Sequence, residues 1–309
     1  MESLHISTRC SKAKETAGYL SLNLKPKGGR AMQVSEAKKL WLDYHRSYSK
    51  ENTVRAYKLV LTKFCEEFGA ENLEDLTTET ILSFLNRITE GKKLQTKKSR
   101  YSHLLAFFNF IKNNINYDFR NPCDTPMLRK LFRAKSTFHW DIIEKETVDE
   151  IIFRTSKPRN RLILELMARG GMRISEVLKL TPSDISDRRL TLREPKSGRE
   201  YEFIFIPQRL ADRLKDYIRE KRISPDERIF PICYEAAREM VAKAGSVVGI
   251  HLRPHDLRRH AATYASRSGV PIEIISKLIL RHSNLSTTER YLGKISDIEA
   301  MKWIDNLYA

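Results

Sequence analysis

The sequence predicts a mainly α-helical protein of two domains that carries one small antiparallel β-sheet. A length of 309 residues suits two domains at roughly 100–200 residues each. Apolar residues recur at helical i, i+3, i+4 spacing along most of the chain. The exceptions are the stretches 189–193 and 200–206, which have the character of two short strands on either side of the turn 194–199.

The first domain is expected over residues 33–120 as a bundle of four helices with short connections. The first helix begins near Val34, and the second follows Ser49, with Thr53 as a possible N-cap, and stops at Gly69. The other two are predicted over 78–88 and 97–113. Residues 1–32 show no clear period and are expected to form a flexible basic arm, which either touches a polyanion or is simply a loose terminus.

Residues 121–145, with Pro122 and Pro126, are expected to form a basic linker between the domains. The second domain is then 146–309. Its helices are predicted from Glu146, over 159–169 and from Ile174, and again over most of the chain after the two strands. An amphipathic helix is expected over 296–308. That helix packs either on its own domain or on a neighbouring protomer.

The charge balance favours a polyanionic partner. The chain has 56 Lys and Arg against 39 Asp and Glu, a net charge of +17, and nucleic acid is the commonest polyanion inside cells. A merely cationic surface remains the alternative. Neither an apolar run long enough to span a bilayer nor a basic amphipathic anchor is evident, so no membrane association is expected.

The basic residues are concentrated between Lys92 and Lys135, where eleven Lys and Arg face only Asp118 and Asp124. A one-sided basic stripe suits a protein that follows a phosphate backbone, although a solvated helix face and a charged linker would also be basic. The candidate DNA-binding residues in this stretch are Lys92, Lys93, Lys97, Lys98, Arg100, Arg129, Lys130 and Arg133.

No metal site and no cofactor are expected. The four cysteines are scattered without a CxxC pair, which indicates reduced thiols in a cytoplasmic protein. The histidines near His255 show no HExxH spacing, and the arginines among them would repel a cation. The chain also has no phosphate-binding Gly-x-x-x-x-Gly-Lys loop.

Three clusters carry candidate chemistry. In the first, Gly170 and Gly171 end one helix, and Arg173 stands where the next begins, with Glu176 placed to hold it. In the second, His255 and Arg258 lie three residues apart on one helix face. The third runs from Leu280 to Tyr291 and contains His282. Taken alone, the first cluster could be an ordinary Arg–Glu pair at a helix start, and the tyrosine of the third could be a packed aromatic ring.

Together the clusters resemble the tyrosine recombinase family of phage integrases and Xer-like proteins, over about residues 146–291. The G-[LM]-R-x-S-E-x-x-x-L run of the family matches 171–180, its H-x-L-R run matches 255–258, and its T-x-x-Y end matches 288–291. Two departures weaken assignment to a subfamily. Arg281 replaces the glycine of the L-G-H run, and Leu292-Gly293 follows the tyrosine.

The resemblance implies a helical core-binding domain followed by an α+β catalytic domain. It also implies a site-specific DNA recombinase for integration, excision or dimer resolution, acting through a 3′-phosphotyrosyl bond without ATP or metal. Four protomers would act on two double-stranded DNA sites, a monomer being possible without DNA, in the cytoplasm at the nucleoid. A type IB topoisomerase and a non-catalytic DNA-binding relative are the alternatives. The residues implied to be catalytic are Arg173, Lys196 (in the β-turn), His255, Arg258, His282 and the nucleophile Tyr291, supported by Glu176.

Overall fold

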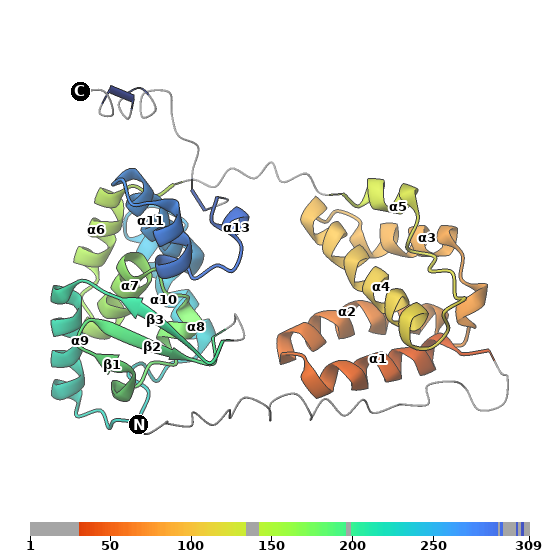
Figure 1. The fold of residues 1–309 in the computed structure, drawn as a ribbon, viewed down its shortest axis with the longest axis horizontal. Coiled ribbons are helices and arrows are strands. Elements are labelled where there is room, and N and C mark those ends of the chain that lie inside the picture. The colour runs from red at the N-terminus through yellow and green to blue at the C-terminus, as the bar shows by residue number, and fades with distance from the viewer. Residues whose placement is uncertain are drawn as a thin grey trace, which may run out of the picture. The chain divides into compact units, whose positions relative to one another are not determined.

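The computed structural model describes residues 31–133, 142–195, 199–289, 291–292, 301 and 304–305. The chain divides into two compact units, Met1–Thr137 and Phe138–Ala309, which are drawn in Figure 1. The predicted N-terminal arm, except for its last two residues, and the β-turn residue Lys196 lie outside the described residues. So does nearly all of the predicted tail helix.

The first unit is a helical bundle with the order that the periodicity predicts. One expected N-cap and one expected helix start are wrong. Lys50, not Thr53, caps the second helix, because the carbonyl of Lys50 already accepts from the amides of Thr53 and Val54. The fourth helix begins at Leu94, three residues earlier than expected. The helices are α1 (Val34–Tyr48), α2 (Glu51–Phe68), η1 (Leu73–Asp75), α3 (Thr78–Thr89) and α4 (Leu94–Asn114).

The core of the first unit is rich in phenylalanine and extends into the stretch expected to be linker. Phe64, Phe84 and Phe108 are fully buried. A short helix α5 (Pro126–Leu131) follows α4, and the ring of Phe132 just beyond it stacks on Tyr101 with a centroid separation of 5.2 Å. The beginning of the predicted linker therefore packs within the first unit.

The second unit contains the predicted sheet. Strands β1 (Ile185–Ser186), β2 (Arg189–Arg193) and β3 (Tyr201–Phe205) are antiparallel in the order β1-β2-β3. In the register of the hairpin, Leu192 lies opposite Glu202. The surrounding helices are α6 (Lys145–Arg154), α7 (Pro158–Gly170), α8 (Ile174–Val177), η2 (Pro182–Asp184), α9 (Gln208–Lys221), α10 (Tyr234–Ser246), α11 (Pro254–Arg267), α12 (Ile272–Ile274), a π-helical turn η3 (Ile275–Ile279) and α13 (Leu285–Glu289).

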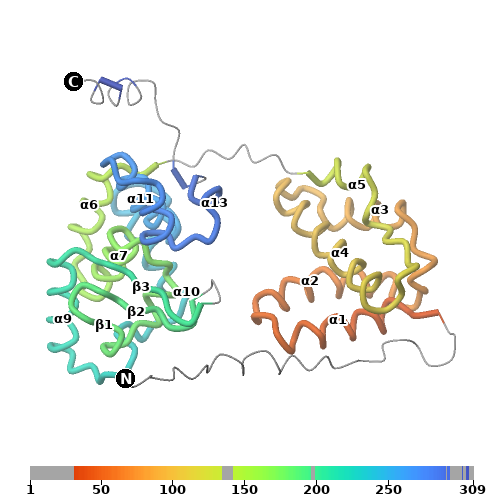
Figure 2. Tube along the Cα trace, in the orientation of Figure 1, coloured from red at the N-terminus to blue at the C-terminus, as the bar shows by residue number. Residues whose placement is uncertain are grey.

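Helix α7 is the centre of this unit, with Leu162 to Ala168 all buried. It packs against α6, α9 and α11. Figure 1 labels α7 and α11 beside each other, and Figure 2 traces the same view, although about ninety residues separate the two helices in the sequence. Neither α7 nor any other helix in the described ranges is both long and apolar enough to cross a membrane.

A glycine corner ends α7 and places the first candidate site residue. Gly171 has a left-handed φ of 59°, which glycine adopts without the steric cost of a side chain. A Cβ on Gly171 would lie 2.7 Å from Cγ2 and 2.9 Å from the carbonyl oxygen of Ile279 in η3. The corner and η3 are therefore in direct contact, and Arg173 becomes the residue that caps α8.

Candidate active site

Arg173 and Glu176 form the predicted pair at the start of α8. Nη1 of Arg173 donates to Oε1 of Glu176 at 2.6 Å, and the backbone amide of Arg173 donates to Oε2 at 2.8 Å. Burial alone would raise the pKa of Glu176, but Arg281 and Arg173 outweigh it and lower the pKa. Glu176 thus stays ionised and holds Arg173 by both its backbone and its side chain.

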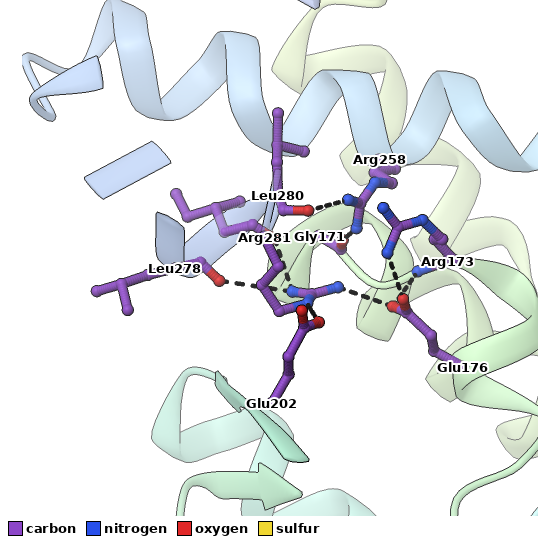
Figure 3. A network of polar contacts seen from close by, with 9 residues as sticks. Gly171, Arg173, Glu176, Glu202, Arg258, Leu278, Leu280 and Arg281 are labelled. Atoms are coloured by element: carbon purple, nitrogen blue, oxygen red, sulfur yellow. Dashed lines mark hydrogen bonds and ion pairs between the residues drawn. The ribbon is translucent and has the colours of Figure 1, made fainter. Parts of the chain in front are cut away.

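Arg258 is completely buried at the second turn of α11. Its Nη1 donates to the carbonyl of Gly171 and its Nη2 to the carbonyl of Leu280 (Figure 3). Burial, then the positive charges of Arg173 and Arg281, lower the pKa of Arg258. The guanidinium therefore joins the glycine corner to the segment before His282, which orients it rigidly beside Arg173.

Arg281, which stands where the family has a glycine, is also buried. Its side chain is 2% exposed, and its Nη2 donates to Oε2 of Glu176 at 2.7 Å. Its Nε lies 3.5 Å from Oε2 of Glu202 on β3, and its Nη1 donates to the carbonyl of Ile279 at 2.7 Å. Figure 3 shows this guanidinium between the two carboxylates. The sequence departure is therefore part of an ionic network around Glu176.

His282 and Tyr291 lie next to each other on the two sides of α13. Their rings meet edge to face with centroids 5.1 Å apart. The backbone of Tyr291 is fixed at both polar groups, because its amide donates to the carbonyl of Thr288 at 2.8 Å and its carbonyl accepts from Oγ1 of Thr263 at 3.0 Å. The guanidinium carbon of Arg259 lies 5.8 Å from the centre of the Tyr291 ring.

Both candidate histidines are held neutral. Burial, then the charges of Arg258 and Arg173, lower the pKa of His282 to about 4. The same causes lower the pKa of His255, against a smaller opposite effect of Asp256. His255 precedes Arg258 by three residues on α11, as predicted. Neutral imidazoles can accept or relay a proton, whereas imidazolium ions can only donate one.

The structure thus brings together every described residue of the predicted catalytic set. Arg173, Glu176 and Arg258 are linked through the glycine corner. The positive charge of Arg258 lowers the pKa values of His255 and His282, and Tyr291 is close enough to affect the pKa of Arg258. Lys196 belongs to the segment between β2 and β3 that lies outside the described residues. Among the residues that the structure describes, no three His, Cys, Asp or Glu side chains are placed to hold a metal ion.

The predicted DNA-binding residues belong to the first unit and not to this site. Lys92, Lys93 and Lys98 are exposed at or before the start of α4. Arg129 on α5 pairs with Asp124, which raises the pKa of Arg129. The remaining candidates are Lys97 and Arg100, which are half-buried, and Lys130 and Arg133, which are exposed.

Sequence reasoning missed two contributors to the site. Glu202 belongs to no motif. The sequence of its strand suggests that the aromatic residues Tyr201, Phe203 and Phe205 face the core. In the structure they face solvent instead, while Glu202 and Ile204 face inward. Ser276 was also missed. Its hydroxyl accepts from Thr288 at 2.9 Å. The one available signal was the replacement of the turn glycine by Arg281, because a buried arginine requires a carboxylate partner.

Comparisons with known proteins agree on one family. Residues 142–295 match the model of the phage integrase family. The chain is 30% identical to the tyrosine recombinase XerA of Pyrococcus furiosus over 257 residues, covering 78% of this chain and 83% of that one. It is also 30% identical to a tyrosine recombinase of Thermosipho africanus, over 82% of this chain and 92% of the relative.

Solved structures give the same fold at lower identity. The Tn1549 transposon integrase in complex with transposon right end DNA has a TM-score of 0.69 at 17% identity, covering 90% of this chain and 100% of that chain. A lambda integrase dimer bound to a COC′ core site has a TM-score of 0.66 at 20% identity, covering 85% and 77%. The mainly helical fold with a small antiparallel sheet is therefore that of these enzymes.

Proposed function

Since this chain belongs to the tyrosine recombinase family and is a site-specific recombinase, we propose that it cuts and rejoins duplex DNA through a covalent bond to Tyr291. The observation that carries the proposal is the placement of Arg173 and Arg258 on the two sides of one glycine corner, with His282 against the ring of Tyr291. A phosphodiester placed there would meet two fixed positive charges and a nucleophile.

The first step is attack by the Tyr291 hydroxyl oxygen on the scissile phosphorus. The new bond is a 3′-phosphotyrosine, and the bond from phosphorus to the 5′ oxygen breaks. Negative charge grows on the non-bridging oxygens, where a preorganised donor contributes roughly 2.7–4 kcal/mol. Neutral His282 or His255 takes the tyrosine proton, and Lys196 gives a proton to the departing 5′ oxygen.

The second step is the reverse reaction with another strand. A 5′ hydroxyl of a partner duplex attacks the phosphotyrosine, the bond to Tyr291 breaks, and the DNA is resealed. The bond energy is conserved in the intermediate, so the reaction needs no external energy source. An integrase of the same fold in complex with transposon right end DNA, and another bound to a COC′ core site, support duplex DNA as the partner.

Covalent trapping tests the nucleophile. Wild-type protein incubated with a library of duplexes should yield an adduct that survives denaturant, and its mapping would give site, polarity and cleavage spacing. Tyr291→Phe should bind the same duplexes with nearly unchanged affinity and form no adduct. An adduct in Tyr291→Phe would place the nucleophile elsewhere.

A second substrate tests the role of Lys196. Lys196→Ala should cleave slowly on ordinary DNA and recover on a duplex whose leaving group is a 5′ thiol, because a thiolate leaves without a proton. If the 5′-thio substrate gives no recovery, Lys196 is not the general acid.

We further propose that four protomers act on two DNA sites during integration, excision or resolution. Exchange of strands between two labelled duplexes, with a protein–DNA complex of that size on a native gel, supports this assembly. Relaxation of supercoils by a single bound protomer without exchange would instead indicate a topoisomerase-like activity. Binding without cleavage by the wild type would indicate a non-catalytic relative.

A further inference from the structure

Arg281 occupies a position that is unfavourable for arginine in two respects. Its φ is 51°, in the left-handed region where a side chain is disfavoured and glycine is not. Its side chain is also almost completely buried, and burial lowers its pKa. A residue that only had to form the turn before His282 would be glycine, so the guanidinium must be what the position requires.

The contacts of Arg281 span three separate segments of the second unit. One is η3 behind it, where the carbonyls of Leu278 and Ile279 accept from Nη1. The others are Glu176 in α8 and Glu202 in β3. Arg281 therefore connects α8, the strand that leaves the β2–β3 turn and the segment that leads to His282 (Figure 3).

From these contacts we propose that Arg281 is a positioning residue. It occupies one oxygen of the Glu176 carboxylate, so that the guanidinium of Arg173 binds only the other oxygen and remains available for the phosphate. The proposal rests on the proposed function. Arg281 binds Oε2 of Glu176, while the side chain of Arg173 binds Oε1 through a single nitrogen, Nη1. Without Arg281, Oε2 keeps only the backbone amide of Arg173 as a donor and can accept a second N–H from the fork-shaped guanidinium of Arg173. That guanidinium then binds Glu176 in a bidentate manner and turns away from DNA.

Glu202 is the second carboxylate that pairs with Arg281. It is a buried carboxylate on β3, and the guanidinium of Arg281 lies between it and Glu176. Arg173 and Arg281 pair with these two carboxylates, whereas Arg258 donates to backbone carbonyls, which leaves one positive charge to be balanced by a phosphodiester. The network is thus neutral with substrate bound and carries one excess positive charge without it.

The test uses Arg281→Gly together with Glu202→Gln. Arg281→Gly restores the usual turn residue but leaves Glu202 buried without a cation, so this single variant is expected to be unstable. The double variant removes both charges and keeps the backbone relaxed. We expect it to fold and to bind duplex DNA within about threefold of wild type, yet to form the Tyr291 adduct roughly 10- to 100-fold more slowly in single turnover, as for other residues that orient a site from behind.

Arg281→Lys provides an independent variant that keeps a positive charge. A lysine reaches one carboxylate as a point charge, so its cleavage rate should lie between those of the wild type and the double variant. Arg219→Ala, an exposed arginine on α9, is the matched control and should cleave like the wild type. A folded double variant that cleaves at the wild-type rate overturns the proposal, and so does Arg281→Lys if it is as slow as the double variant. Absence of any adduct in the wild type would refute the proposed function instead.

Discussion

The hydroxyl of Thr288 lies 3.0 Å from Nδ1 of His282 and 2.9 Å from the hydroxyl of Ser276, to which it donates. Because the proton of Thr288 is directed at Ser276, Nδ1 of the neutral His282 ring is the donor to Thr288. The other ring nitrogen, Nε2, then carries a free lone pair. The relationship selects the tautomer in which Nε2 can accept a proton.

Thr288→Val should therefore slow cleavage without weakening DNA binding. Valine has nearly the shape of threonine but offers no acceptor to Nδ1, so the ring of His282 loses its fixed tautomer. We expect single-turnover adduct formation to fall by roughly 10- to 100-fold, the range for partners that orient a reacting histidine. Thr287→Val, the adjacent half-exposed threonine, is the control. Equal rates in both variants would remove Thr288 from the mechanism.

Arg258→Lys should reduce both stability and cleavage. Lysine keeps the charge, but one ammonium group cannot replace the forked donation to Gly171 and Leu280, so a buried carbonyl loses its partner. We expect the free energy of unfolding in denaturant to fall by roughly 1.5–3 kcal/mol. Single-turnover cleavage should fall by about 100- to 1000-fold. An unchanged unfolding transition would contradict the buried contacts.

Stability should decrease as the pH is lowered below neutrality. The pKa of His282 is about 4 in the folded protein, whereas in the unfolded chain it is about 6.5. Between these values the unfolded chain binds the proton more readily, so this stabilisation is complete above about pH 6.5 and is lost as the pH falls toward 4. His282→Asn should lose less stability than the wild type between about pH 7.5 and about pH 5 in denaturant unfolding. Identical losses would mean that His282 does not contribute.

DNA affinity should depend on salt through the basic stretch 92–135. Lys98→Gln removes one exposed positive charge at the start of α4. We expect the slope of log affinity against log salt to become less steep by roughly 1, with the loss similar for all duplex sequences. Lys63→Gln on α2, outside this stretch, should leave the slope unchanged. Fluorescence anisotropy over a salt series measures both, and equal slopes for the two variants would exclude a phosphate contact at Lys98.

Most of the helical architecture is predictable because single faces of the helices are buried. The spacing of Leu104, Phe108 and Ile111 gave α4, and the Gly170-Gly171 pair gave the end of α7. Helix starts were less predictable. Lys50 caps α2 with its backbone alone, and a sequence search for capping side chains finds Thr53 instead.

The ionic network was not predictable because it depends on contacts between distant segments. Glu202 and Glu176 meet Arg281 only after the sheet, the glycine corner and η3 have come together. Local alternation in β3 gave the strand but not its orientation, since the aromatic side chains would ordinarily be assigned to the buried face. The Arg173–Glu176 contact was predictable, because two residues that are three positions apart at a helix start lie on the same side of the turn.

The π-helical turn Ile275–Ile279 has a consequence for which changes of length the chain can tolerate. Such a turn holds one residue more than an α-helical turn, and each residue of an α-helix advances the chain by about 100° around its axis. Deleting a single residue within η3 would convert it to a regular turn. Because the wide turn carries the chain around the axis by about as much as a regular turn with one residue fewer, Leu280, Arg281 and His282 would keep their direction towards Arg258 and Glu176. The segment between α12 and His282 should therefore tolerate the loss of one residue better than the gain of one, since a further insertion has no regular turn left to absorb it.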